Sequence, residues 1–199
     1  MARGTPEIRY AEVDRESKET RVHVVLDLDG GSRQDVATGF SAFDRLLSLF
    51  AAEAQFDLGL SVDAHESVDD HVVLRDAGLA LGKALRDALS ESDPVNQLAD
   101  CVVVKADARV LAALDIHGKA GAFVTLPSER EMIGDVASQS LSLFLSSLAH
   151  AGGITLHIVK QAGENDQHVF EAAFKGLGLV LYHGTQLQNR VNSNSPKRS

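Results

Sequence analysis

The spacing of apolar positions along the chain switches repeatedly between two periods, which predicts a mixture of strands and helices. Apolar and polar residues alternate along 21–29, as is typical of a half-buried strand, and 8–13 is its candidate partner. Apolar positions at helical spacing predict helices over about 40–55, 69–90, 134–150 and 167–183. Further short apolar runs predict strands at 58–62, 101–105, 112–116, 122–126 and 154–160.

The order of these elements repeats along the chain. A helix, a short strand, a polar loop and a longer helix occur in 38–90 and again in 134–183. Such a duplication indicates two similar half-domains that share one core. We expect the first half-domain at 7–95 and the second at 96–188, with flexible ends at 1–6 and 189–199.

Composition narrows the class of protein further. Apolar residues make up 44% and charged residues 24%, so the chain can build a sizeable core. The formal net charge of −9 argues against nucleic acid and anionic membranes as partners. No apolar run is long enough to span a membrane, and no secretory signal is evident, so we expect a cytoplasmic protein. The single cysteine, Cys101, rules out an internal disulfide and reads as a buried, inert thiol.

Several short segments carry a more specific signal. Residues 18–20 precede an alternating strand, 29–31 and 38–40 lead toward the first helix, 68–71 open the second helix, and 163–168 lead into 171–175. In this order and spacing, over about 7–190, they resemble the signature blocks of the imidazoleglycerol-phosphate dehydratase family. The resemblance implies an α/β (α+β) fold of two duplicated half-domains, with helices packed between or against mixed β-sheets. It also implies a lyase of histidine biosynthesis that dehydrates imidazoleglycerol phosphate to imidazoleacetol phosphate.

The family's chemistry depends on manganese, and the resemblance allows its ligand positions to be located here. Two manganese ions bind the substrate's imidazole ring and provide a charge sink when an unactivated C–H proton is removed. The ligands are a His-His-x-x-Glu motif in each half and one histidine on each preceding helix, a donor set that suits a first-row divalent ion. Three of the eight positions keep the family residue: His71, His168 and Glu171. The other five are replaced by Arg45, Val72, Arg75, Leu143 and Gln167.

The substrate-binding positions that the resemblance implies are only partly retained. Glu19, a substrate-contacting acid in the family, and Lys175, a phosphate-binding residue, are present. Lys119 replaces one phosphate-binding arginine and is a weaker bidentate donor, while Gln97 replaces the other. The acidic pair that contacts the substrate hydroxyls corresponds to 106–107, of which only Asp107 is acidic. The family's C-terminal serine cannot be assigned among Ser193, Ser195 and Ser199.

Each retained residue also has a simpler interpretation. His71 is equally well explained as a polar residue at a helix start, and His168 and Glu171 as a surface pair three residues apart on one helix. Glu19 and Lys175 can simply face solvent. Three remnants spread over two metal centres cannot complete either one, so we expect no bound manganese here.

The two introduced arginines lead to a structural expectation. A guanidinium cannot deprotonate to relieve repulsion by a divalent cation, but it can take that cation's place electrostatically. We therefore expect Arg45 and Arg75 to pair with Glu171 or with Asp44 and Asp76.

Three functions remain open, and the sequence leaves undecided whether the chain is still an enzyme. The first is a catalytically impaired pseudoenzyme that acts as a binding, regulatory or structural protein and co-assembles with an active paralogue. The second is an active dehydratase with a remodelled site. The third is a binder of another phosphorylated ligand that uses Arg45, Arg75, Lys119 and Lys175. Because metal ligands from neighbouring subunits join trimers into cages in this family, we expect a smaller homo-oligomer here, a trimer.

Overall fold

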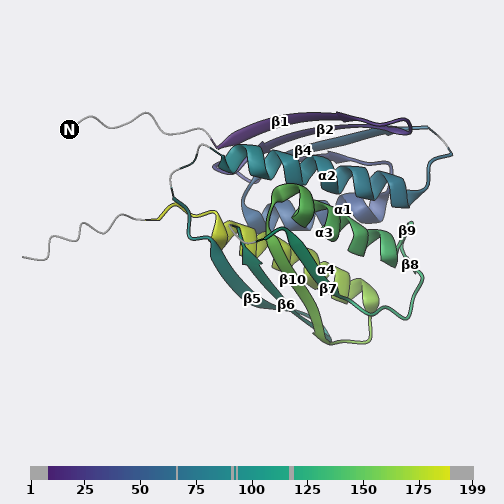
Figure 1. Cartoon of the computed structure of the whole chain (residues 1–199). Helices are drawn as coiled ribbons and strands as arrows, with labels where there is room; N and C mark the ends of the chain where they lie inside the picture. Colours follow the sequence, from purple (N-terminus) through teal and green to yellow (C-terminus); the bar gives the residue numbers. More distant parts are fainter. Residues whose placement is uncertain (1–8, 66, 91, 93, 117–118, 189–199) are drawn as a thin grey trace, which may run out of the picture.

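Four helices form a layer between two four-stranded sheets (Figure 1). The computed structural model describes residues 9–65, 67–90, 92, 94–116 and 119–188. This architecture confirms the expected α/β (α+β) class, with helices packed between mixed sheets. None of the helices in the described part of the chain combines the length and apolar composition needed to cross a membrane.

The first half of the chain builds one sheet and two helices. Its elements are β1 (Tyr10–Glu16), β2 (Thr20–Asp27), β3 (Gln34–Ala37), α1 (Ser41–Ala54), β4 (Asp57–Ala64) and α2 (Asp70–Leu89). The strand order is β1-β2-β4-β3, with β3 parallel to β4 and the other pairs antiparallel. Apolar side chains alternate with polar ones along β1 and β2, so one face of the sheet covers the helices and the other faces outward.

The second half repeats this arrangement. Its elements are β5 (Leu98–Lys105), β6 (Ala108–Asp115), β7 (Gly121–Thr125), β8 (Met132–Ile133), β9 (Val136–Ala137), α3 (Ser138–Gly152), β10 (Thr155–Ala162) and α4 (Asp166–Gly184). The strand order β5-β6-β10-β7, with β7 parallel to β10, matches that of the first sheet. The register matches as well, because Tyr10 pairs with Asp27 and Leu98 pairs with Asp115. The two sheets therefore have the repeated connectivity that duplication predicts, while the boundary between residues 95 and 96 stays a prediction.

The helix layer is held together by aromatic rings and by close helix contacts at glycine. The rings of Phe43 and Phe144 lie 5.0 Å apart edge to face, and those of Phe144 and Phe174 stack at 5.6 Å, which joins α1, α3 and α4. A Cβ added to Gly82 on α2 would lie 2.4 Å from the carbonyl oxygen of Leu148 on α3. Gly178 on α4 meets α1 in the same way, so the two helix pairs pack backbone to backbone.

Two elements differ from the expectation. Strand β3 has no alternating apolar pattern, and its pairing comes from the hydrogen-bonding edge that β4 offers. The helix expected from 134 begins at Ser138, because Gly134 with a φ of +65° makes a turn between β8 and β9. In that turn Asp135 accepts hydrogen bonds from the amides of Ser41 (2.7 Å) and Ala42 (3.0 Å), which satisfies the start of α1.

The remaining local expectations have mixed outcomes. Cys101 was expected to be buried and is half-buried against the core, where burial raises the pKa of its thiol, so the expectation is met only in part. The expected flexible ends at 1–6 and 189–199 lie outside the described residues. His117 and Gly118, which precede Lys119, also lie outside them.

Candidate functional site

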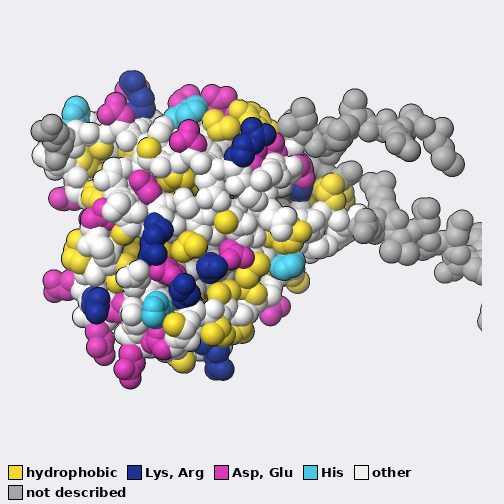
Figure 2. All heavy atoms as spheres, turned by 180° about the vertical axis from the view of Figure 1, so that it is seen from behind, with side chains coloured by type: hydrophobic (Ala, Val, Ile, Leu, Met, Phe, Trp, Pro, Cys, Tyr) yellow, Lys and Arg dark blue, Asp and Glu magenta, His cyan; other side chains and the backbone are white. Residues whose placement is uncertain are grey.

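The expected ligand positions are carried by all four helices. Arg45 lies on α1, Leu143 lies on α3, and two groups lie near the starts of the longer helices: His71, Val72 and Arg75 on α2, and Gln167, His168 and Glu171 on α4. Acidic and basic side chains are intermixed over the face shown in Figure 2, without one large patch of lysine and arginine. The site is therefore described by individual charge pairs.

Glu171 is the centre of the first group of side chains. It lies on α4, and its side chain is only 5% exposed. Its Oε1 accepts hydrogen bonds from the guanidinium of Arg45 and from Nε2 of Gln167, the latter at 3.1 Å. The Nζ of Lys105 lies 3.3 Å from its other oxygen, Oε2. We call Arg45, Lys105, Gln167 and Glu171 the Glu171 group.

Local structure explains why these four residues meet. Gln167 and Glu171 are four residues apart on α4 and share one face of the helix. Helix α1 packs against α4 and brings Arg45, while β5 ends beside α4 with Lys105. Burial raises the pKa of Glu171, but the hydrogen bonds from Gln167, Arg45 and Lys105 outweigh burial and hold the pKa below its ordinary value. The carboxylate is therefore an ionised, fully partnered group.

Asp76 is the centre of a second group in the other half. Its side chain is completely buried on α2. It accepts hydrogen bonds from Oγ1 of Thr20 at 2.7 Å, from Nε of Arg75 at 3.1 Å and from a guanidinium nitrogen of Arg15 at 3.5 Å. Burial raises the pKa of Asp76, but the hydrogen bonds from Thr20 and Arg75 outweigh it, so the pKa lies below its ordinary value. We call Arg15, Thr20, Arg75 and Asp76 the Asp76 group.

The two arginines thus pair as expected from the sequence. Arg45 contacts Glu171, and Arg75 contacts Asp76. Asp44 is not a partner, because its Oδ1 accepts hydrogen bonds from the amide and the hydroxyl of Thr38 at 2.9 and 2.6 Å. Each guanidinium reaches a buried carboxylate while remaining partly exposed itself.

His168 and Glu171 both lie on α4 but contact different residues. Its Nδ1 lies 2.6 Å from Oδ1 of Asp107, the acid retained from the expected substrate-contacting pair. The other oxygen of Asp107 accepts hydrogen bonds from the amides of Glu164 (2.7 Å) and Asn165 (3.0 Å). The hydrogen bond from the amide of Asn165, followed by those from His168 and from the amide of Glu164, lowers the pKa of Asp107 and favours its ionised form.

The remaining expected site residues do not converge. Lys175 on α4 forms an ion pair with Glu53 on α1 at 2.7 Å, whereas Lys119 is exposed before β7 and makes no side-chain ion pair within the described chain. His71 is exposed at the start of α2 and has no side-chain hydrogen bond to any described residue. Val72 and Leu143 are half-buried hydrocarbons that offer no ligand atom.

Glu19 lies at a pocket of about 250 Å³ beside the first sheet. The pocket is lined by the turn between β1 and β2, residues 16–21, and by Asp63, Ala64 and His65 at the end of β4. Thr20 belongs both to this wall and to the Asp76 group, so the pocket adjoins the buried carboxylate of Asp76. Of the expected site residues, only Glu19 lines it.

Sequence reasoning missed Lys105 and Arg15 as members of these groups. Both lie on strands, and their partners are 66 and 61 positions away, as Lys105 contacts Glu171 and Arg15 contacts Asp76. Strand alternation gives each residue a face but not a partner, so no local signal identifies them.

Comparison with known proteins decides the family. The family model described as imidazoleglycerol-phosphate dehydratase matches residues 38–181. This chain belongs to the imidazoleglycerol-phosphate dehydratase family. The imidazoleglycerol-phosphate dehydratase of Metallosphaera sedula is 37% identical over 180 residues, which is 90% of this chain and 93% of that relative. That of Thermoanaerobacter pseudethanolicus is 35% identical over 184 residues, covering 92% of this chain and 95% of the relative.

Solved structures of the dehydratase family have the same fold. The imidazoleglycerol-phosphate dehydratase of Pyrococcus furiosus is similar with a TM-score of 0.78 at 30% identity, over 92% of this chain and 98% of that one. The structure from Staphylococcus aureus has a TM-score of 0.80 at 20% identity, a likeness that concerns the fold alone. The family resemblance inferred from the signature blocks is therefore confirmed along nearly the whole chain.

Proposed function

We propose that this member of the imidazoleglycerol-phosphate dehydratase family no longer carries out the manganese-dependent dehydration, and acts instead as a binding, regulatory or structural protein. One observation carries the proposal: both oxygens of Glu171, a retained ligand position, are engaged by protein donors, with Arg45 and Gln167 on one and Lys105 on the other.

The residues present do not fit a divalent cation at Glu171. A manganese ion there would lie beside the guanidinium of Arg45 and the ammonium of Lys105, and like charges at such distances repel strongly in a partly buried site. The guanidinium cannot lose its proton to reduce this repulsion. Replacing this contact by a metal would also break the hydrogen bond from Gln167, which stands where the family has histidine.

The other half supports the same proposal. Arg75 stands where the family motif has glutamate, and it is paired with the buried carboxylate of Asp76. Val72 provides no ligand atom, and neither does Leu143 on the neighbouring helix α3, so His71 is the single retained donor beside Arg75. One imidazole binds a divalent ion too weakly to make a structural or catalytic centre.

A second candidate is an active dehydratase with a remodelled site, and the comparisons favour it. Relatives from Metallosphaera sedula and Thermoanaerobacter pseudethanolicus, at 37% and 35% identity, both bear the name imidazoleglycerol-phosphate dehydratase. Similarity of this extent along whole chains, taken alone, supports activity better than loss of it. The contacts of Glu171 and Asp76 are the reason to place impairment first.

The third function, a binder of another phosphorylated ligand, has less support from the contacts. Three of its four expected cations already face carboxylates: Arg45 faces Glu171, Arg75 faces Asp76, and Lys175 faces Glu53. A phosphate group would have to compete with each of these ion pairs. Only Lys119 is without such a partner in the described chain.

Turnover of imidazoleglycerol phosphate by the purified chain tests the proposal directly. We expect no imidazoleacetol phosphate, with or without added Mn²⁺, and no manganese retained after gel filtration. The dehydratase of Metallosphaera sedula, assayed in parallel, establishes that the substrate and metal are competent. Manganese-dependent product from this chain would reject the proposal and establish the second candidate.

We also propose that the chain assembles as a homo-trimer, because the replaced positions include residues that join trimers in the family. Mass photometry of the purified chain is expected to give a trimer mass that does not change when Mn²⁺ is added. A larger particle that appears only with Mn²⁺ would contradict this prediction. We further propose that the chain co-assembles with an active paralogue and is located in the cytoplasm.

A further inference from the structure

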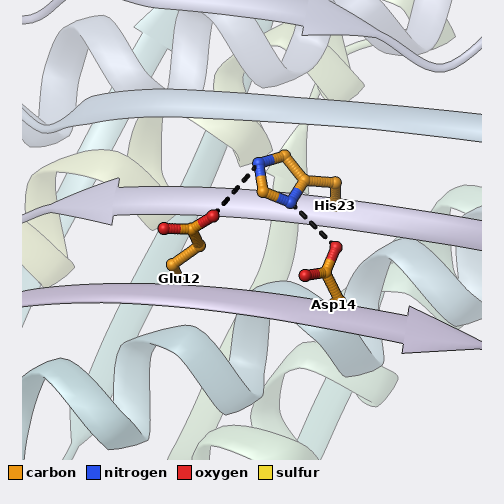
Figure 3. A group of neighbouring side chains, drawn as sticks. All are labelled: Glu12, Asp14 and His23. Atoms are coloured by element: carbon orange, nitrogen blue, oxygen red, sulfur yellow. Dashed lines mark hydrogen bonds and ion pairs between the residues drawn. The ribbon is translucent and has the colours of Figure 1, made fainter.

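A cluster of possible metal ligands lies outside the family site, on the outward face of the first sheet. Glu12 and Asp14 project from β1, and His23 projects from β2 between them (Figure 3). Among the residues that the structure describes, this is the one group of three whose ligand atoms all lie within 4.8 Å of one another.

The sheet register places the three side chains together. Asp14 is directly opposite His23 in the antiparallel pair, and Glu12 is two residues from Asp14 on the same face. The Nδ1 of His23 lies 2.9 Å from Oδ1 of Asp14, and its Nε2 lies 3.9 Å from Oε1 of Glu12. The backbone therefore holds the ligands near one another before any ion arrives.

We propose that Glu12, Asp14 and His23 form a binding site for a divalent transition-metal ion of the Zn²⁺ type. Imidazole nitrogen and carboxylate oxygen are donors that Zn²⁺ accepts, and tetrahedral ligands about 2.1 Å from such an ion lie about 3.4 Å apart. One ligand atom from each residue can be chosen so that all three lie within 4.8 Å of one another, whereas the 2.9 and 3.9 Å contacts involve the two different ring nitrogens of His23. Because the side chains of Glu12 and Asp14 are exposed, both carboxylates can rotate toward one ring nitrogen of His23 and bind one ion there, with water completing the coordination.

Comparison with the matching strands of the second sheet, β5 and β6, shows that the fold alone does not produce this cluster. The matching registers of the two hairpins relate Glu12, Asp14 and His23 to Asp100, Val102 and Leu111. In the second sheet the corresponding positions thus carry one carboxylate and two hydrocarbons. The outward faces of the two sheets have diverged, and only the first offers a complete set of donors.

The neighbouring positions leave room for an ion. His23 is opposite Ser61 on β4, and the next position along that row, Val25, is opposite Gly59. A small hydroxyl and a glycine leave the side of the imidazole open, and the side chains of Glu12, Asp14 and His23 are 55%, 76% and 41% exposed. In an ordinary pair of surface ion pairs each carboxylate faces its own ring nitrogen of His23, whereas a metal site gathers both carboxylates around one nitrogen.

Metal titration of the chelator-treated chain tests the site. Co²⁺, followed by its visible absorption, and Zn²⁺, followed by calorimetry, are expected to bind at one site. The His23→Gln variant is expected to weaken binding by at least about tenfold, since losing a direct ligand costs no less than losing a supporting residue. A Glu12→Gln/Asp14→Asn double variant is expected to do the same.

Matched histidine variants make the assignment specific. His157 is exposed on the outward face of the second sheet, where it stacks on Phe123, so His157→Gln removes a comparable histidine without touching the cluster. His168→Gln removes a histidine of the family site. Both controls are expected to bind Co²⁺ like the parent chain. No binding by the parent chain, or equal binding by all variants, overturns the proposal. Loss with His168→Gln instead overturns it and also contradicts the impaired metal site, which keeps the two proposals distinguishable.

Discussion

Replacing Asp76 with alanine is expected to lower the free energy of unfolding by about 2–3 kcal/mol. The carboxylate is completely buried and accepts hydrogen bonds from Thr20, Arg75 and Arg15. Its removal leaves two guanidiniums side by side without their shared counter-charge and removes the closest partner of the buried Thr20 hydroxyl. Both guanidiniums are partly exposed and can turn toward water, which keeps the loss below that of a fully buried pair. Urea denaturation measures the change.

The loss of stability caused by Asp76→Ala should become smaller as the pH falls. Because the pKa of Asp76 lies lower in the folded chain than in the unfolded chain, its contribution is complete above an unfolded value of about 3.9 and is lost as the pH falls through the folded value. The difference from the parent chain should therefore shrink below about pH 4. Asp35→Ala, at an exposed position of β3, is the control and should change stability by less than about 0.5 kcal/mol. A pH-independent difference, or one no larger than the control's, would contradict this account.

Gly82→Ala is expected to destabilise the chain by about 3 kcal/mol, at the upper end of what overpacking costs. The added Cβ would lie 2.4 Å from the carbonyl oxygen of Leu148 and 2.8 Å from the amide nitrogen of Gly152. Both atoms belong to the backbone of α3, so the helices must move apart to admit one methyl group. The gain in helix propensity, about 1 kcal/mol, is too small to offset this. Thermal unfolding followed by circular dichroism measures the loss.

Gly152→Ala is the matched control, because this helical glycine lies on the other side of the same contact. Its added Cβ would be 3.5 Å from the carbonyl oxygen of Gly82, which is an ordinary contact distance. The variant should keep the melting temperature of the parent chain within a few degrees, for a change of about 0.5 kcal/mol. If the two variants have the same melting temperature, Gly82 is not needed for the close packing of α2 on α3.

Most of the fold could be predicted from the periodicity of apolar residues. Helices α1, α2 and α4 begin and end within a few residues of the expected positions, because each buries one stripe of apolar side chains. Strand β3 could not be found this way, since its residues Gln34–Ala37 have no buried alternation and its order comes from pairing with β4. The start of α3 was misplaced because the hairpin of β8 and β9 depends on a turn at Gly134.

Only part of the candidate site could be predicted from the sequence. Signature blocks predicted eight family ligand positions, and Arg45 and Arg75 stand at two of these expected positions. They could not supply Lys105, whose contact with Glu171 arises where a strand end meets a helix of the other layer. Nor could they separate His168 from Glu171, which are three residues apart but contact different partners.

The sequence by itself determined the family and the repeated order of elements, and it predicted which side chains stand at the expected ligand positions. These are properties of local pattern and spacing, which survive without knowledge of the third dimension. Only the tertiary structure decided which charge faces which: Arg45 and Lys105 converge on Glu171, and His23 lies between Glu12 and Asp14. The reason is physical, because electrostatic interaction depends on distances of a few ångströms and on burial, and packing sets both between residues far apart in the chain.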